Sequence, residues 1–220
     1  MTNMNIDQAR FNMIEQQVRP WEVLDHNVLQ VMSDIPREAF VPQQYRELAF
    51  SDVEIPLTDG QVILQPRIEG RIMQSLDIKA DDRILEIGTG CGYMTACLSR
   101  LGDSVVTIEC IQKLSDQAKK NIEAQNISNV NFRVGDAADG WDQDGPFDVI
   151  AVTGSMPVVP KKLKSVLHKR GRLFVIEGVA PVMHAKLITR SSSEGFQEET
   201  LFEISIPTLS GVNTEKEFVF

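Results

Sequence analysis

The sequence predicts an α/β fold, with a doubly wound, mostly parallel sheet and helices on both of its faces. From about residue 80 onward, short β-rich runs alternate with helical stretches, which is the pattern of successive βαβ units. A glycine-rich turn, Gly88 to Gly92, follows the first of these runs, and the second run ends in Glu109, about twenty residues later. These two signals predict a ligand site at the carboxyl ends of the first strands.

Residues 1–80 differ in character from the rest of the chain. Apolar spacing predicts one helix over residues 11–18 and another over residues 24–31, each ending before a proline. Neither belongs to the βαβ series. We expect residues 1–80 to form a helical cap on the substrate side of the molecule, and residues 81–220 to form the ligand-binding core, in one compact unit.

The core is expected to contain seven strands. Five of them are predicted at residues 83–88, 104–109, 130–134, 147–153 and 172–177. Helices are predicted between them at residues 93–100, 113–125 and 160–168.

Two further strands are expected near the end of the chain, at residues 185–190 and 201–206, joined by a polar turn over residues 191–195. A turn this short permits only antiparallel pairing. The predicted sheet is therefore parallel with an antiparallel edge.

Composition restricts the class of protein. The 220 residues fit one domain with an extension, and the net charge of −9 disfavours a nucleic-acid partner. The sequence lacks an apolar run of about 18 residues and a basic-then-apolar leader, so we expect no membrane span and a cytoplasmic protein. Cys91, Cys97 and Cys110 lack C-x-x-C spacing, and the three histidines are scattered. We therefore expect reduced thiols and no metal site.

The glycine turn argues against a nicotinamide dehydrogenase. The dinucleotide motif G-x-G-x-x-G would need glycine at position 93, where this chain has Tyr93, and Gly92 comes one residue early. Glu86, just before the first glycine, would repel a pyrophosphate but would suit a ligand that carries an ammonium group. S-adenosylmethionine carries one on its methionine tail, so we expect this cofactor.

Three segments, together with Ile63, supply the expected cofactor contacts. The acid that ends the second strand of a βαβ unit reaches ribose hydroxyls, and residues after the third strand, Gly135 to Ala137, are placed for the base edge. The residues expected to contact the cofactor are Ile63, Glu86, Gly88, Thr89, Gly90, Cys91, Glu109, Cys110, Asp136 and Ala137.

A narrow set of motifs lies before the predicted sheet. Residues 36–42 read P-R-x-x-F-V-P, residues 49–52 read A-F-S-D, and residues 61–66 read Q-V-I-L-Q-P. With the glycine turn and Pro146-Phe147-Asp148, they cover most of the chain. In these motifs the sequence resembles the protein-L-isoaspartate (D-aspartate) O-methyltransferases. The resemblance implies a seven-stranded S-adenosylmethionine methyltransferase fold.

The same resemblance implies a repair reaction. Such an enzyme transfers a methyl group from S-adenosylmethionine to the free α-carboxyl of an isoaspartyl residue, and the ester then collapses to a succinimide. The implied partners are isoaspartyl-containing proteins or peptides, and we expect a monomer or a weak dimer. A carboxylate with a pKa of about 4 is already ionised at pH 7, so no general base is required.

The chain departs from the family in the segment over the transferred methyl group. Family members read T-[IV]-S-x-P there, and the serine is treated as the active-site residue, whereas this chain has Leu64 at that position. Gln65 and Arg67 are the residues that could instead hold an acceptor carboxylate, although Arg67 also fits an exposed arginine on the next helix. Arg67 and Glu69 are both unusual in a stretch that the family keeps mostly apolar or aromatic.

Two alternative functions stay open because of Leu64. In the first, a methyltransferase of the same family acts on a different, more apolar acceptor, such as a small molecule. In the second, the protein binds the cofactor but has lost catalysis.

Overall fold

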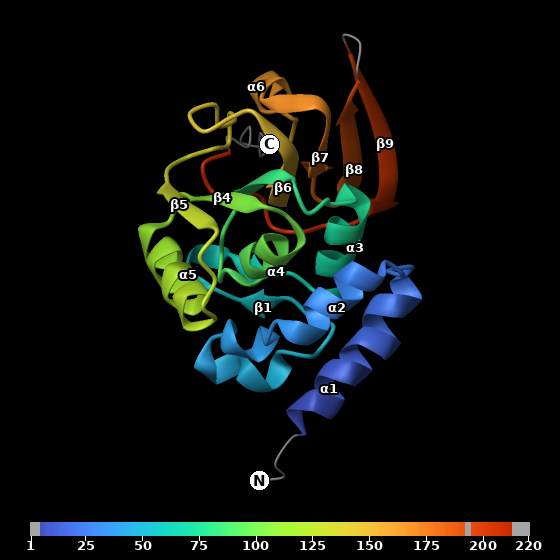
Figure 1. Cartoon of the computed structure of the whole chain (residues 1–220), viewed down its shortest axis with the longest axis vertical. Coiled ribbons are helices and arrows are strands. Elements are labelled where there is room, and N and C mark those ends of the chain that lie inside the picture. The colour runs from blue at the N-terminus through green and yellow to red at the C-terminus, as the bar shows by residue number, and fades with distance from the viewer. Residues whose placement is uncertain (1–4, 192–194, 213–220) are drawn as a thin grey trace, which may run out of the picture.

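A seven-stranded sheet forms the centre of the computed structural model, which describes residues 5–191 and 195–212 (Figure 1). Its strand order is β5-β4-β3-β6-β7-β8-β9. The first five in this order are parallel, and β8 and β9 add the antiparallel edge. The strands are β3 (Arg83–Ile87), β4 (Ser104–Glu109), β5 (Val130–Val134), β6 (Phe147–Met156), β7 (Leu167–Val179), β8 (Val182–Arg190) and β9 (Phe196–Glu203). The predicted mostly parallel, seven-stranded sheet is confirmed.

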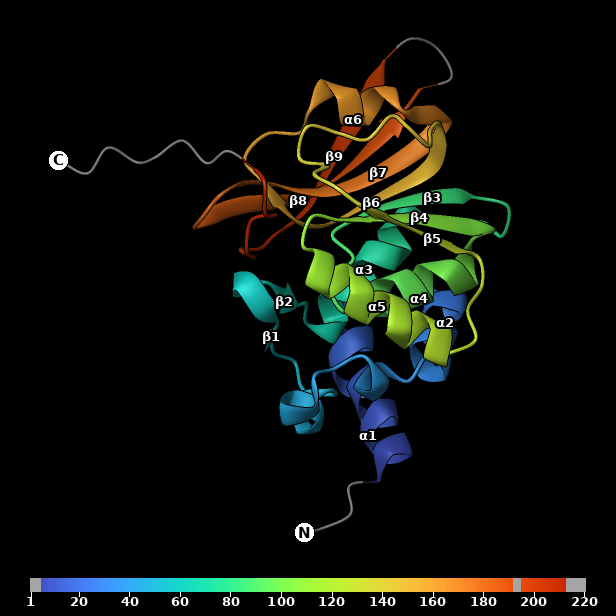
Figure 2. The ribbon, with the colours of Figure 1, turned by 90° about the vertical axis from the view of Figure 1, so that its left-hand side faces the viewer.

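The central strands are apolar because both faces of the sheet are covered. In β3, Ile84 belongs to the hydrophobic cluster on one face and Leu85 to the cluster on the other, and both are fully buried. Figure 2 shows three helices on the first face, α3 (Pro66–Leu76), α4 (Tyr93–Leu101) and α5 (Gln112–Ala124). On the other face lies the short helix α6 (Lys161–Ser165), so the predicted helices on both faces are present but unequal.

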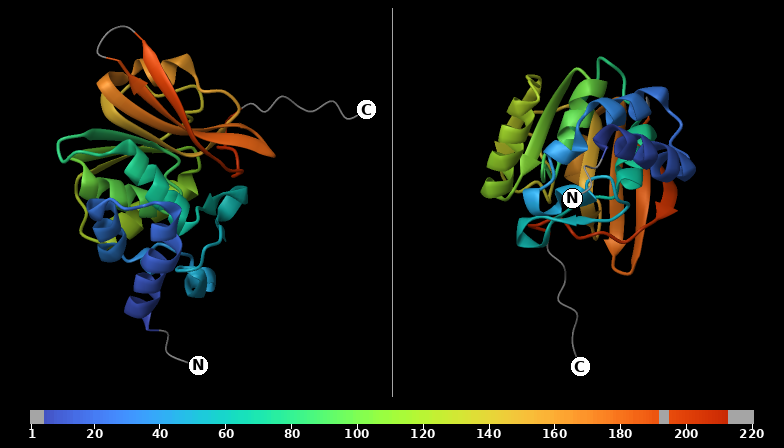
Figure 3. Two further views of the ribbon diagram at one scale, coloured as in Figure 1. Left: turned by 90° about the vertical axis from the view of Figure 1, so that its right-hand side faces the viewer. Right: turned by 90° about the horizontal axis from the view of Figure 1, so that it is seen from below.

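The N-terminal helices extend the thicker face, on the side away from α6 (Figure 3). Met13 and Met32 are fully buried and share a hydrophobic cluster with Ile84 of the sheet, so the two parts have a common core. Asp25 caps α2 by accepting hydrogen bonds from two backbone amides of its first turn. The elements of this part are α1 (Ile6–Met13), the π-helical turn η1 (Ile14–Val18), η2 (Arg19–Trp21), α2 (His26–Asp34), η3 (Arg37–Ala39), η4 (Gln43–Leu48), β1 (Ile55–Pro56), η5 (Thr58–Gly60) and β2 (Val62–Ile63).

Two boundaries near the end of the chain differ from the prediction. The helix predicted to reach residue 168 ends at Ser165, because Leu167 already pairs with Phe147 at the start of β7. The last strand lies earlier than residues 201–206, because β9 pairs with β8 from Phe196 onward. After Phe196, residues 197–200 are polar and exposed on an edge strand, so they lack the apolar signal of a strand. The predicted turn falls partly on residues 192–194, outside the described residues.

Candidate cofactor and acceptor site

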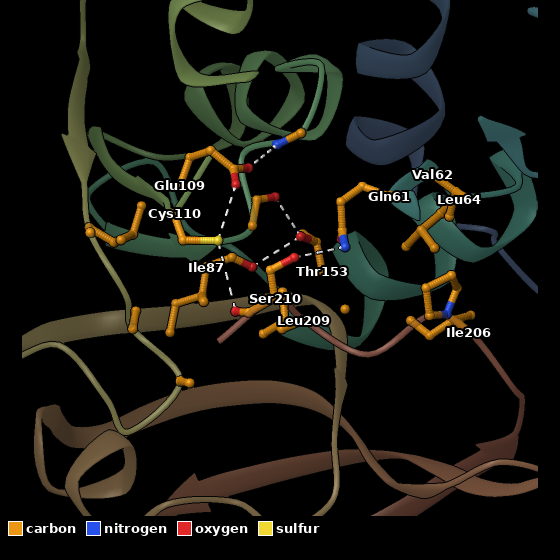
Figure 4. Close-up of a pocket in the computed structure, with 18 residues that line it drawn as sticks. Gln61, Val62, Leu64, Ile87, Glu109, Cys110, Thr153, Ile206, Leu209 and Ser210 are labelled. Carbon is orange, nitrogen blue, oxygen red and sulfur yellow. Dashed lines mark hydrogen bonds between the residues drawn. The ribbon is translucent and has the colours of Figure 1, made fainter. Parts of the chain in front are cut away.

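A cleft opens at the carboxyl ends of β3, β4 and β6, where the strand order reverses direction (Figure 4). Chain segments before β3 and after β9 complete its walls. The residues that line it are Gln61, Val62, Leu64, Ile87, Gly88, Gly90, Ile108, Glu109, Cys110, Gly135, Ala137, Ala138, Thr153, Gly154, Ile206, Pro207, Leu209 and Ser210.

Glu109 is fixed at the end of β4 by backbone amides. One of its carboxylate oxygens accepts a hydrogen bond from Gly90 N at 2.9 Å (Figure 4). The other accepts one from Ile111 N at 3.1 Å. Such a carboxylate is oriented to accept hydrogen bonds from ligand hydroxyl groups. Cys110 and Ala137 line the same cleft, as predicted, whereas Asp136 lies between lining residues and accepts a hydrogen bond from Ala138 N at 2.8 Å.

The glycine turn leaves no room for side chains where it meets β6. Gly88 has φ +96°, and a Cβ there would lie 2.5 Å from Thr153 Oγ1. Thr153 Oγ1 lies 2.6 Å from the Gly88 carbonyl oxygen and therefore holds the turn in place. The sequence analysis did not name Thr153, although its position at the end of the predicted strand 147–153 was a usable signal.

Glu86 lies below the glycine turn, outside the cleft. It is fully buried and accepts hydrogen bonds from Thr95 Oγ1 at 2.5 Å and from Thr107 Oγ1 at 2.7 Å. Thr107 Oγ1 lies 2.6 Å from Thr89 Oγ1, so the carboxyl group connects to the turn through two hydroxyls. Burial raises the pKa of Glu86 to about 8. Both hydroxyls donate to Oε2, and the other oxygen, Oε1, is buried without a hydrogen-bond partner among the described residues. The ammonium contact expected for Glu86 stays a prediction.

A second hollow continues from the cleft along the other side of the glycine turn. It shares Val62, Leu64, Gly88, Gly90 and Thr153 with the cleft, so the two spaces adjoin each other. Its further lining residues are Ile63, Glu69, Thr89, Cys91 and Met94.

The hollow has an apolar wall where a family serine was expected. Leu64 is buried and lines both the cleft and the hollow. Burial raises the pKa of the Cys91 thiol to about 12, so Cys91 stays protonated and is no nucleophile at neutral pH. This wall excludes water but carries no acid or base at Leu64.

A buried ion pair lies behind this wall. Arg37 Nε donates to Glu69 Oε2 at 3.0 Å, and both side chains are almost completely buried. The other two nitrogens of the guanidinium donate to the carbonyl oxygens of Ala49 and Leu64, each at 2.6 Å. Arg37 therefore fixes the backbone that carries Leu64. The sequence analysis quoted Arg37 only as part of a motif, and nothing in the local pattern indicated its partner.

The two predicted carboxylate-holding residues lie outside both spaces. Gln65 precedes α3 as its N-cap residue and lines neither the cleft nor the hollow. Arg67 pairs with Asp52 at 2.9 Å, and its guanidinium lies 4.2 Å from the centre of the Trp21 ring. Arg67 thus lines neither the cleft nor the hollow, and its contact with an acceptor carboxylate stays a prediction.

The last described segment covers the cleft. Gln61 Nε2 donates to Ser210 Oγ at 3.0 Å, which joins the chain before β2 to the chain after β9 (Figure 4). Leu209 packs on the glycine turn, since a Cβ on Gly88 would lie 3.1 Å from Leu209 Cδ2.

S-adenosylmethionine fits these residues. Glycines that cannot carry a Cβ leave the turn open to a ligand, an anchored carboxylate faces the cleft, and the hollow adds room at the other side of the turn. Among the described residues, no group of three or more His, Cys, Asp or Glu side chains could hold a metal ion, and no helix is long and apolar enough to cross a membrane. Fold and cleft together define an S-adenosylmethionine-dependent methyltransferase.

Comparison with known proteins gives the family. The model of the protein-L-isoaspartate(D-aspartate) O-methyltransferases matches residues 8–208. Protein-L-isoaspartate O-methyltransferase 1 of Geotalea uraniireducens is 38% identical over 86% of this chain and 87% of its own length. Protein-L-isoaspartate O-methyltransferase 2 of Pelobacter propionicus is 36% identical over 94% and 92%. The chain belongs to the protein-L-isoaspartate O-methyltransferase family.

Solved structures agree with the fold. One protein-L-isoaspartate O-methyltransferase matches with a TM-score of 0.80 and 25% identity, over 93% of this chain and 66% of that one. A Plasmodium falciparum protein, described as a putative member of the same family in complex with S-adenosyl-L-homocysteine, matches with a TM-score of 0.77 and 19% identity, over 94% and 98%. The second likeness concerns the fold alone.

Proposed function

We propose that this protein methylates the free α-carboxylate of isoaspartyl residues in damaged proteins, with S-adenosylmethionine as the methyl donor. The observation that carries the proposal is the cleft, in which Glu109 and the glycine turn face an apolar wall formed by Leu64. Family membership over residues 8–208 supports the acceptor class. When bound, the cofactor supplies a methyl group on a sulfonium, and transfer of that methyl leaves a neutral thioether.

The residues of this chain have binding and positioning roles in the proposal. Glu109 accepts hydrogen bonds from the ribose, Thr153 holds the glycine turn, and Leu64 with Leu209 keeps water from the reacting atoms. Gln61 and Ser210 carry neutral donors that line the cleft and face each other, so they are placed to orient an acceptor carboxylate. The acceptor needs no base, since it is ionised at pH 7. Catalysis then comes mainly from placement of the two reactants.

We also infer that the protein acts in the cytoplasm as a monomer or weak dimer. Its three cysteines are free thiols, which supports a reducing compartment. Sedimentation equilibrium of the purified protein checks the oligomeric state, and a stable larger oligomer would contradict this inference.

Transfer of labelled methyl from S-adenosylmethionine to an isoaspartyl peptide tests the function. We expect base-labile label on that peptide and none on its normal aspartyl twin. Binding of S-adenosylhomocysteine, measured by calorimetry, is the accompanying control for an intact site. Cofactor binding without label on either peptide would refute the isoaspartyl function.

A further inference from the structure

Glu69 is a buried carboxylate that the methyl transfer itself does not require. It lies on α3, is 2% exposed, and lines the hollow beside Leu64 and Cys91. A buried carboxylate is costly unless donors satisfy its oxygens. The position of Glu69 in the lining of this hollow therefore requires an explanation.

Arg37 donates a hydrogen bond to only one oxygen of the Glu69 carboxylate. Its Nε donates to Oε2 of Glu69, while its other two nitrogens are engaged by the carbonyl oxygens of Ala49 and Leu64. Within the described residues, Glu69 Oε1 accepts no hydrogen bond. One oxygen is thus held by the protein and the other is available to a donor in the hollow.

The hollow lies where the far end of the cofactor would extend. A ligand whose ribose meets Glu109 reaches the hollow by passing the glycine turn, because the two spaces share Gly88 and Gly90. The far end of S-adenosylmethionine is zwitterionic, with an ammonium and a carboxylate. The N-terminus of α4, whose Met94 lines the hollow, offers backbone amides to the carboxylate.

We propose that Glu69 binds the ammonium group of the cofactor's methionine tail through Oε1, while Arg37 holds Oε2 and so orients the carboxylate. Glu86, the sequence-predicted partner of that ammonium, is enclosed by Thr95 and Thr107 below the turn and does not line the hollow. This assignment rests on the proposed use of S-adenosylmethionine.

Calorimetry with two ligands tests the assignment without any turnover. S-adenosylhomocysteine carries the amino-acid tail, and 5′-methylthioadenosine lacks it. We expect Glu69→Gln to weaken S-adenosylhomocysteine binding roughly tenfold, the scale of one hydrogen bond between charged groups. Binding of 5′-methylthioadenosine should change by less than about twofold. Glu109→Ala, in contrast, should weaken both ligands, because both carry the ribose.

Controls separate this effect from unfolding. The 5′-methylthioadenosine titration reports the fraction of intact sites in each Glu69 variant, and the exposed Glu123→Gln on α5 is the matched surface control. If Glu69→Gln does not fold, the double variant Arg37→Gln and Glu69→Gln leaves no buried charge unpaired and takes its place.

Each outcome of the calorimetry either supports or overturns the assignment of Glu69. A selective loss of S-adenosylhomocysteine binding supports the assignment. Equal losses for both ligands, or unchanged binding together with a raised KM for the isoaspartyl peptide, would overturn it and leave the proposed function standing. Wild-type protein that binds neither ligand would instead refute the proposed use of the cofactor.

Discussion

The two ends of the site are built in different ways. At the nucleoside end, Glu109 and the glycine turn come from consecutive βαβ elements, and backbone amides fix the carboxylate. At the acceptor end, Leu64 is held by Arg37 from a distant segment and faces Ser210 from the end of the described chain. The first end follows from the topology of the sheet, whereas the second depends on loops that pack together. Cofactor recognition is therefore tied to the fold, and acceptor recognition can change without it.

The largest effect is expected at the nucleoside end. In Gly88→Ala, the new Cβ would lie 2.5 Å from Thr153 Oγ1, on a backbone with φ +96°. We expect S-adenosylhomocysteine binding to weaken by roughly 100-fold or more, since the turn must move out of place. The matched control is Gly60→Ala, where φ is also positive but no atom lies within 4 Å of the Cβ. Calorimetry that finds equal losses in both variants would mean that strain alone, and not the contact with Thr153, sets the requirement.

Leu64→Ser tests the acceptor end of the site. The new hydroxyl restores the residue type that the family resemblance implies, so kcat for the isoaspartyl peptide should rise roughly tenfold. The melting temperature should fall, because emptying a buried leucine site costs about 2–5 kcal/mol. Leu64→Ala makes the same cavity without the hydroxyl and should show no gain in kcat. An unchanged kcat in Leu64→Ser would show that the acceptor end was rebuilt around leucine.

The pH dependence of cofactor binding tests Glu69, which lines the hollow beside the glycine turn. Burial raises the pKa of Glu69 to about 7, although Arg37 acts in the opposite direction. As the pH falls below 7, the carboxylate gains a proton and its attraction for an ammonium group is lost. S-adenosylhomocysteine affinity should therefore rise from pH 6 to pH 8, by roughly three- to tenfold. Calorimetry across this range measures it.

The effect of Glu69 on the pH dependence can be told apart from that of the titratable groups around it. Arg37 stays charged, and burial raises the pKa of three groups packed nearby, Cys91, Tyr93 and Cys97, so that they stay neutral. Glu86, with a pKa of about 8, also titrates in this range but remains present in Glu69→Gln. A pH slope that persists in Glu69→Gln, or that appears with 5′-methylthioadenosine, would assign the effect to another group.

The smallest effect is expected for Arg67→Ala. Asp52 and the Trp21 ring already engage this guanidinium on the outer side of α3. The KM for the isoaspartyl peptide should change by less than about twofold, as is usual for a surface ion pair. The exposed Arg46→Ala serves as the comparison in steady-state assays. A tenfold increase in KM for Arg67→Ala alone would place the acceptor carboxylate on α3 after all.

Sequence patterns predicted the structural features that lie within one βαβ unit. The alternation of strands and helices placed β3, β4 and the glycine turn, and Glu109 follows from its position at the end of a strand. Thr153 was predictable in the same way, because it ends the predicted strand 147–153 and this strand, β6, lies next to β3 in the sheet.

Long-range packing was beyond the sequence patterns. The pair between Arg37 and Glu69 joins residues on different elements, and no periodicity indicates such a partner. The direction in which the Glu86 side chain points could not be predicted for a related reason. A carboxyl group beside a glycine turn can point toward a ligand or into the core, and only the hydroxyls of Thr95 and Thr107 decide between them.

The segment over the cleft has a consequence for the order in which the site forms. Two backbone hydrogen bonds attach this segment to Ser155, from Leu209 N to Ser155 O at 3.0 Å and from Ser155 N to Pro207 O at 3.1 Å. Because a ribosome makes the chain from its N-terminus, β3 to β9 emerge before Leu209 and Ser210. A nascent chain can therefore fold its sheet while the cleft still lacks this cover. Stabilisation by bound cofactor, which requires the finished site, reaches the protein only after Ser210 has been made.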